Sequence, residues 1–257
     1  MRKLIFYNIN LKHSILYLKK LVSQVNTLFE YPLLLKTLTK TDIRGFMKDI
    51  LLIKQKLNYR PKTIFDIGAA RGQWTQAARM VFPEAQIYAF EPITMSYKMM
   101  QDRMIHDNNF HAFNFALSDE TNKISFGLNS FPDSSSILKM TEAHKIEFKQ
   151  TEKEEVIIID AFRLDSIKEI NIVGPAFIKM DVQGAELRVL RGADKILDKI
   201  DGIQLELNFE KFYESQATYI EVCNFMYSHN YKRFFQIGLA ESQKTNKILA
   251  CDLVFLR

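Results

Sequence analysis

From residue 61 onward the chain alternates short apolar runs with longer segments in which apolar residues recur every three or four positions. Runs of about five apolar residues suit buried parallel strands, and the three-to-four spacing is that of amphipathic helices. The expected strands are 64–67, 86–90, 109–117, 176–180 and 202–207. The expected helices are 74–82, 94–106, 187–200 and 216–229. This rhythm predicts an α/β domain with a doubly wound, Rossmann-like sheet.

Two parts of this domain depart from the alternation. Short strands are expected at 123–128 and 155–161, and the loop and charged stretch between them form an insertion of the kind that often covers a ligand. The last two expected strands, 231–236 and 248–256, are separated by the polar segment 240–247 without a helix. Because strands joined without a crossover pair antiparallel, we expect an antiparallel hairpin at one edge of the sheet.

The first 60 residues follow a different pattern. Apolar residues recur there at helical spacing, and a second helix is expected to start at the cap Thr41-Asp42. Residues 1–62 hold 13 Lys or Arg against three acids, whereas the rest of the chain holds 22 against 27. We therefore divide the chain into a basic amphipathic helical arm or cap, 1–60, and an α/β domain, 61–257. The arm either packs on the domain, which we favour, or docks on a partner or an anionic membrane.

The composition of the chain further limits the classes of protein to which it can belong. Hydrophobic residues make up 47% of the 257 residues, enough for a substantial core. Cys223 and Cys251 suggest neither a disulfide framework nor a metal cluster, and the five histidines show no ligand spacing, so no metal is expected. No apolar run is long enough to span a bilayer. We expect a cytoplasmic protein, with the arm as a candidate for peripheral contact with the inner membrane face.

The segment 63–72 supplies the candidate chemistry. A strand carrying Asp66 leads into a turn with Gly68 and Gly72 and then a helix, so backbone N–H groups face a potential ligand. The dinucleotide signature Gly-x-Gly-x-x-Gly is incomplete, because residues 69–71 include no middle glycine to make room for a pyrophosphate. S-adenosyl-L-methionine carries an ammonium and a sulfonium but no phosphate, and Asp66 suits that charge, directly or through water. The turn therefore predicts S-adenosyl-L-methionine as the cofactor.

A second acid closes the next strand. Glu91 follows the run 86–90 and precedes Pro92, and a carboxylate at that strand end can accept hydrogen bonds from both ribose hydroxyls. The alternative interpretation of Glu91 is a solvated acid at a strand end. Ser118 and Asp119, at the end of the third strand, would flank the adenine in this geometry.

Together these segments resemble one family, the FkbM family of S-adenosylmethionine-dependent methyltransferases. The matching segments are 65–72, 90–92, 116–119, the serine loop 134–136, and 178–186 followed by 189–192. The resemblance covers residues 61–235, and the segment Lys-x-Asp-x-x-Gly-x-Glu in order after the others makes the set specific. It implies a class I methyltransferase fold. The cofactor contacts it implies are Asp66, Gly68, Ala69, Gly72, Glu91 and Ser118, with Pro92, Asp119 and Ser135 of the serine loop completing the candidate set.

The resemblance also carries expectations about the reaction. It implies O-methylation of a hydroxyl on a sugar, a glycan or a small natural product, often in surface-polysaccharide biosynthesis. One departure is Gln183, where family members commonly carry Glu. If that acid served the substrate or the base chemistry, Gln183 could not replace it by ionising.

The catalytic candidates end the strand 176–180. Ligands bind outside the carboxyl ends of such strands, so Asp181 is the first candidate for orienting or deprotonating the acceptor, with a purely structural role as its alternative. Lys179 and Glu186 come second: Lys179 to steady a developing alkoxide, Glu186 for the acceptor or for the start of the next helix. Glu206 also ends a strand and could reach the acceptor.

Three hypotheses follow. The first is an O-methyltransferase acting on a glycan or a small hydroxylated acceptor, shaped by loops 129–155 and 208–218. The second is a non-catalytic binding module that keeps the cofactor fold and docks through its basic arm. The third, an RNA-directed enzyme, is disfavoured because the arm lacks an Arg- and aromatic-rich pattern, so nucleic acid is not expected as a partner. The sequence leaves the acceptor and the oligomeric state open.

Overall fold

The computed structural model describes residues 43–129, 134–151, 154–242 and 244–257. The chain divides into two compact units, 1–44 and 45–257, and the elements below belong to the second. Most of the expected basic arm, and its docking on the domain or on a membrane, falls on residues 1–42, outside the described residues. The described helix of this segment is α3 (Arg44–Lys56), which buries Met47, Ile50 and Ile53.

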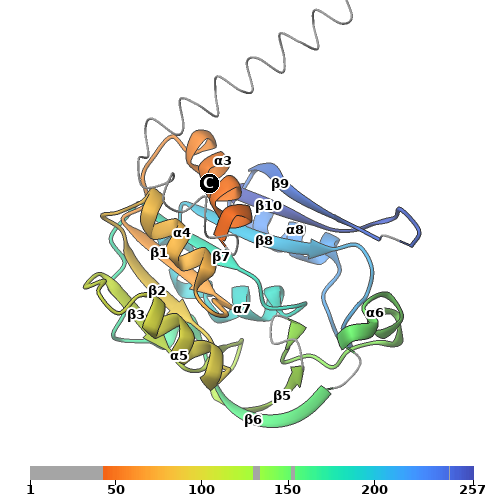
Figure 1. The fold of residues 1–257 in the computed structure, drawn as a ribbon. Coiled ribbons are helices and arrows are strands. Elements are labelled where there is room, and N and C mark those ends of the chain that lie inside the picture. Colours follow the sequence, from red (N-terminus) through yellow and green to blue (C-terminus); the bar gives the residue numbers. More distant parts are fainter. Residues whose placement is uncertain (1–42, 130–133, 152–153, 243) are drawn as a thin grey trace, which may run out of the picture. The chain divides into compact units, whose positions relative to one another are not determined.

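A seven-stranded sheet in the order β3-β2-β1-β7-β8-β10-β9 forms the centre of the unit (Figure 1). Its strands are β1 (Thr63–Ile67), β2 (Gln86–Phe90), β3 (Phe110–Phe113), β7 (Ala176–Met180), β8 (Gly202–Asn208), β9 (Arg233–Glu241) and β10 (Ile248–Leu256). Five neighbouring strands, β3, β2, β1, β7 and β8, run parallel to one another. Strand β10 runs antiparallel to both β8 and β9. This confirms the predicted doubly wound sheet with an antiparallel edge hairpin, in the strand order of class I methyltransferases.

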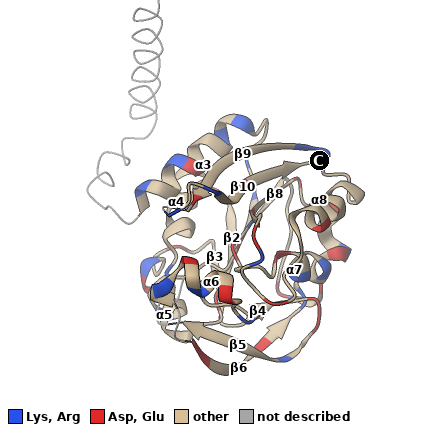
Figure 2. Ribbon diagram, turned by 90° about the vertical axis from the view of Figure 1, so that its right-hand side faces the viewer, with Lys and Arg blue, Asp and Glu red and all other residues tan. Residues whose placement is uncertain are grey.

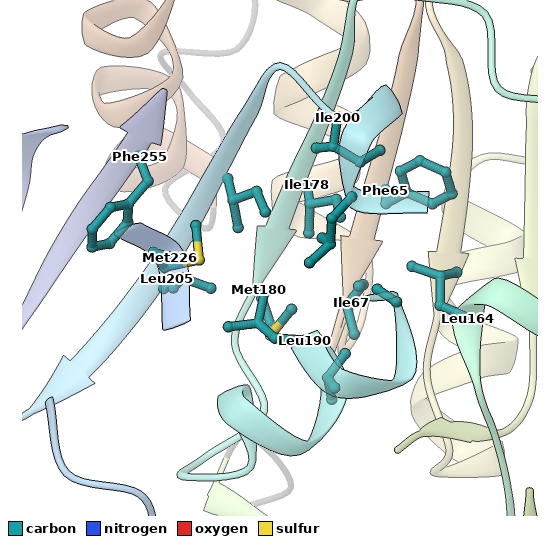
Figure 3. Close-up of a cluster of buried hydrophobic side chains, with 14 of the residues drawn as sticks. Phe65, Ile67, Leu164, Ile178, Met180, Leu190, Ile200, Leu205, Met226 and Phe255 are labelled. Carbon is teal, nitrogen blue, oxygen red and sulfur yellow. The ribbon is translucent and has the colours of Figure 1, made fainter. Parts of the chain in front are cut away.

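Helices cover both faces of this sheet. With α3, the helices α4 (Gln73–Val81) and α5 (Thr94–Arg103) lie on one face, and α7 (Glu186–Gly192) and α8 (Tyr219–Ser228) lie on the other (Figure 1). The largest buried cluster fills the space between the sheet and the α7–α8 face, where Met180, Leu190, Leu205 and Met226 meet (Figure 3). Packing on both faces explains why the parallel strands are mostly apolar, with Asp66 and Lys179 as paired exceptions.

A smaller sheet carries the predicted insertion. It has the order β4-β6-β5, formed by β4 (Ala116–Leu117), β5 (Asn122–Asn129) and β6 (Glu154–Phe162). The described part of the segment between β5 and β6 contains α6 (Glu142–Glu147) and the short 3-10 turn Lys149–Thr151. Further 3-10 turns lie at Leu164–Ser166 and Asp194–Lys199.

Two expected elements are each divided in the structure, and β9 ends at Glu241, beyond the expected end at 236. The strand expected over 109–117 is two strands in two sheets, because Asn114 turns the chain there by donating to the backbone oxygens of Glu91 and Pro92 (2.9 and 3.0 Å). The helix expected to reach residue 200 ends as α7 at Gly192 and continues as a 3-10 turn. At Gly192 a Cβ would lie 1.9 Å from the carbonyl oxygen of Ser118, so the helix end abuts the loop after β4.

Candidate active site

A cavity opens at the carboxyl ends of β1, β2 and β7, the edge at which open α/β sheets bind ligands. Its wall also takes residues from α3 and from the smaller sheet. The lining residues are Phe46, 67–70, Gln73, Trp74, 90–93, 115–117, Phe126, 135–137, Lys179, 181–183 and Ala185. From the sequence-predicted set, the cavity is lined by Gly68, Ala69, Glu91, Pro92, Ser135, Lys179 and Asp181.

The glycine turn is held from both sides. The backbone N–H groups of Gly68 and Ala69 donate to the carbonyl oxygen of Phe90 (3.1 and 3.0 Å), and that of Asp181 donates to Ile67 (3.0 Å). Gly68 has a φ of +71°, and a Cβ there would lie 1.9 Å from the carbonyl oxygen of Asp181. Backbone conformation and space therefore both require glycine, and the turn stands directly beside the loop that carries Asp181.

Glu91 ties the turn to the end of β2. Its Oε2 accepts from the backbone N–H of Ala70 (2.9 Å) and its Oε1 from that of Ile93 (2.8 Å). Burial raises the pKa of Glu91 to about 7, although these two hydrogen bonds act in the opposite direction. Each carboxylate oxygen can accept a further hydrogen bond, so Glu91 still offers two acceptors to a ligand in the cavity.

Asp66 lies behind the turn and does not line the cavity. It is fully buried, accepts from the hydroxyl of Thr75 (2.5 Å) and pairs with Lys179 Nζ (3.1 Å). Lys179 also donates to the carbonyl oxygen of Gly68 (2.9 Å). Burial by itself would lower the pKa of Lys179, but the carboxylates of Asp66 and Asp181 raise it above the ordinary value. The pair therefore holds the turn on the side away from the cavity, and contact of Asp66 with the cofactor ammonium, directly or through water, stays a prediction.

Three other predicted cofactor residues also stand behind the cavity wall. Gly72 precedes α4 and packs against the side chain of Met100. Ser118 is fully buried and donates to Asp119 (2.9 Å), which pairs with Arg188 (2.9 Å). Burial by itself would raise the pKa of Asp119, but the hydrogen bonds from Arg188 and Ser118 lower it below the ordinary value. The strand ends were found correctly from the sequence, but strand-end position alone does not say which side chain turns toward the cavity.

Ser135 is the predicted serine-loop residue that lines the cavity. Its hydroxyl accepts from the backbone N–H of Asn129 (2.9 Å), which joins the serine loop to the end of β5. The neighbouring Ser136 donates to the backbone oxygen of Gln183 (2.8 Å). The smaller sheet is thereby connected to the loop after β7.

The loop after β7 holds the first catalytic candidate in a hydrogen-bonded chain. Asp181 is exposed, and its Oδ1 accepts from Gln183 Nε2 (2.8 Å). Gln183 Oε1 accepts from the hydroxyl of Tyr213 (2.9 Å), whose oxygen lies 3.3 Å from His144 Nε2. An amide suits this position because it donates to a carboxylate and accepts from a phenol, whereas an ionised Glu has no proton to donate. Gln183 therefore orients the side chain of Asp181.

Two further acids lie close to Asp181 without lining its cavity. Glu186 is buried at the start of α7 and accepts from the backbone N–H of Gly184 (3.2 Å) in the loop before the helix. Burial raises the pKa of Glu186 to about 7. Glu206 on β8 is partly buried, and burial together with Asp181 and Glu186 raises its pKa well above the ordinary value.

Some lining residues were not predicted as ligand contacts. Trp74 lines the cavity, and its buried Nε1 donor has no partner among the described residues. Its place in the first helical turn after the glycines was the available signal. Phe46 lies on α3, outside the segment that resembles the family, so no motif pointed to it. Tyr213 and His144 also carried no motif.

The described residues contain no group of three or more His, Cys, Asp or Glu placed to hold a metal ion. Within the same ranges, no helix has the length and apolar character that crossing a bilayer requires.

The strand order and the cavity at the ends of β1, β2 and β7 define the class of protein: a Rossmann-like class I methyltransferase fold. The model of the methyltransferase FkbM domain family matches residues 66–233, well over half of the chain. The chain therefore belongs to the FkbM methyltransferase family.

Two curated relatives are similar over 160 residues each. The 2-O-methyltransferase NoeI of Sinorhizobium fredii (strain NBRC 101917 / NGR234) is 28% identical, over 60% of this chain and 66% of its own. Methyltransferase 1 of Beauveria bassiana (strain ARSEF 2860) is 28% identical, over 56% of this chain and 64% of its own. The chain thus spans slightly less than two thirds of the length of these relatives.

Among solved structures, precorrin-6y C5,15-methyltransferase from Geobacter metallireducens GS-15 gives a TM-score of 0.44 at 12% identity, covering 82% of this chain and 88% of that one. Magnesium protoporphyrin IX methyltransferase from Synechocystis PCC 6803 gives a TM-score of 0.43 at 8% identity, covering 83% of this chain and 80% of that one. The fold assignment rests on the strand order of the chain itself.

Proposed function

We propose that the chain is an S-adenosylmethionine-dependent O-methyltransferase that acts on a hydroxyl of a sugar, a glycan or a small hydroxylated natural product. The observation that carries this proposal is the position of Glu91. Its carboxylate holds the glycine turn by two hydrogen bonds and still presents acceptors to the cavity. Membership of the FkbM methyltransferase family supports the reaction class. The relative NoeI is a 2-O-methyltransferase, which supports oxygen as the methylated atom.

The residues of the cavity suit S-adenosylmethionine. Glu91 offers its two oxygens to a ribose, and Trp74 lines the same cavity. Gly68 and Ala69 present backbone rather than bulky side chains to the ligand.

The cofactor, when bound, supplies an activated methyl group, so the chain has to align the acceptor, exclude water and manage one proton. Asp181 is the residue placed for that proton, because Gln183 occupies its Oδ1 and leaves Oδ2 without a hydrogen-bond partner among the described residues. Lys179 holds the turn through Asp66 and Gly68, and in this proposal it positions the site rather than contacting the alkoxide.

Calorimetric titration of the full chain with S-adenosylmethionine and S-adenosylhomocysteine tests the cofactor part of the proposal. We expect one site for each ligand. A chain that is folded by circular dichroism and binds neither ligand would contradict the proposal, and would leave the non-catalytic binding module as the better account.

A further inference from the structure

A second, smaller cavity lies beside the first, at the carboxyl end of β8. Gln183 lines both cavities and so marks their border. Glu206 and Asn208 line the second cavity from β8, and His144, Phe148 and Phe212 line it from the insertion and from the loop after β8. It occupies the same edge of the sheet as the first cavity, where ligands of this fold bind.

Backbone hydrogen bonds hold the walls of this cavity in place. Thr141 N donates to the carbonyl oxygen of Phe212 (2.9 Å), and Glu214 N donates to that of Lys139 (2.7 Å). The side-chain oxygen of Gln216 accepts from the backbone N–H groups of Phe212 and Tyr213 (3.1 Å each). The insertion and the loop after β8 are thus joined into one wall, which gives the cavity a defined shape without a ligand.

The polar groups of this cavity are free to bind. Glu206 and Asn208 are two residues apart on β8 and therefore face the same side of the sheet. Neither side chain has a hydrogen-bond partner among the described residues, although both are partly buried. A half-buried carboxyl and amide without partners are costly unless a ligand or water satisfies them. Together they offer acceptors and donors at adjacent points, which suits neighbouring hydroxyl groups.

The rest of the lining combines aromatic and apolar side chains with the polar groups of Gln183, His144 and Tyr213. The rings of Phe148 and Phe212 have centroids 5.5 Å apart at 66°, and His144 stands edge-on to Phe212 at 5.9 Å. Leu249 and Ala250 of β10 add small apolar contacts. Aromatic and apolar walls that carry placed polar groups are the usual composition of a small-molecule site. A sugar ring combines hydroxyl groups with C–H faces and so matches both parts of this lining.

We propose that this second cavity binds the ring of a polyhydroxylated acceptor, with Glu206 and Asn208 hydrogen-bonded to its hydroxyl groups. The inference rests on the proposed O-methyltransferase function and deepens it by assigning the acceptor to a place in the fold. A ring held there borders Gln183 and, through it, Asp181 in the methyl-donor cavity. Tyr213, hydrogen-bonded to Gln183, links the acceptor wall to the same chain.

Saturation-transfer NMR on the full chain with S-adenosylhomocysteine present tests the inference. The probes are the methyl glycosides of glucose, galactose, mannose, fucose and N-acetylglucosamine, with cyclohexanol as an apolar ring that carries one hydroxyl. We expect transfer to the ring protons of at least one glycoside and none to cyclohexanol. Glu206→Gln and Asn208→Ala should each weaken glycoside binding by about tenfold, the effect of losing one buried hydrogen bond.

The matched control is Glu210→Gln, which alters an exposed acid paired with Lys247 close in sequence but not lining the cavity. It should leave glycoside binding within about twofold of wild type, as expected for an exposed ion pair. All three variants should bind S-adenosylhomocysteine like the wild type, which shows that they fold and retain the donor site. Glycoside binding unchanged in Glu206→Gln and Asn208→Ala, or absent from the wild type, would overturn the inference. Failure of S-adenosylhomocysteine to bind would instead count against the proposed function.

Discussion

At the scale of single residues, Glu91 connects the fold to the ligand. It holds Ala70 and Ile93 by their backbone N–H groups, and burial raises its pKa to about 7. Only the ionised carboxylate offers both oxygens as acceptors to two ribose hydroxyls. Cofactor affinity should therefore rise as pH increases through about 7, and binding at pH 6.5 should release a proton. Calorimetry in buffers of different ionisation enthalpy measures both effects.

The substitution Glu91→Gln should weaken binding of S-adenosylhomocysteine by about tenfold or more, because charge-assisted hydrogen bonds are lost. It should also flatten the pH dependence. Glu84→Gln, at an exposed acid, is the control and should keep the wild-type profile. A steep pH dependence that persists in Glu91→Gln would assign the titration to another group.

Asp181 carries the second prediction at this scale. Its carboxylate is exposed and supported by Gln183, so Asp181→Asn should remove the group that takes the acceptor proton. A general base contributes about 10²- to 10⁴-fold, so methyl transfer should fall by a factor in that range while cofactor affinity changes little. Steady-state rates and calorimetry on the same preparation separate the two quantities. Full activity in Asp181→Asn would show that alignment alone drives the reaction.

At the scale of elements, α3 takes part in the cofactor cavity although the family match starts after it. Phe46 lines the cavity, and its side chain is 37% exposed. Phe46→Ala should raise the Kd for S-adenosylhomocysteine by roughly tenfold through lost apolar contact, with little loss of stability. Phe234→Ala on β9 is the control, since that exposed ring lies outside the cavity lining. Equal affinity of both variants would mean that α3 only covers the sheet.

The elements themselves were largely predictable from the sequence, and the site less so. Buried strands such as 176–180 were recognisable in the sequence because helices cover both faces of the sheet. Each position of this strand is therefore apolar or, like Lys179, in an ion pair. The break at Asn114 was hidden, because it depends on hydrogen bonds to Glu91 and Pro92 from a distant strand. The burial of Asp66 was hidden for the same reason: its partner Lys179 lies 113 residues away and meets it only in the parallel register of β1 and β7.

At the scale of the whole molecule, the compact unit buries several acids near the carboxyl edge of the sheet. Basic and acidic residues are otherwise interspersed over its helices and strands (Figure 2). Burial raises the pKa of Glu91 and Glu186 to about 7 and that of Asp252 to about 6. The folded state therefore binds more protons than the unfolded state between their unfolded and folded pKa values. Stability falls across that window as pH rises.

We therefore expect the free energy of unfolding of the unliganded chain to fall from pH 5.5 to 7.5. The fall should be about 2 kcal/mol for each acid whose pKa is raised to about 7. Burial lowers the pKa of His144, so its contribution to the free energy of unfolding rises with pH below its ordinary pKa of 6.5. The net loss of stability is therefore smaller than the sum over the buried acids. Urea unfolding at the two pH values measures the change. Glu186→Gln should reduce the slope, and stability that rises with pH in the wild type would contradict the assignment of these buried acids.

The account as a whole depends on methyl transfer to oxygen. The most direct measurement incubates the full chain with S-adenosylmethionine labelled in its methyl group and a panel of sugars and glycans, and then locates the label by NMR. We predict a labelled O-methyl ether on a sugar hydroxyl, formed by the wild type and strongly reduced in Asp181→Asn. Label found on nitrogen or carbon, or no transfer to any hydroxylated acceptor by a chain that binds the cofactor, would contradict the account.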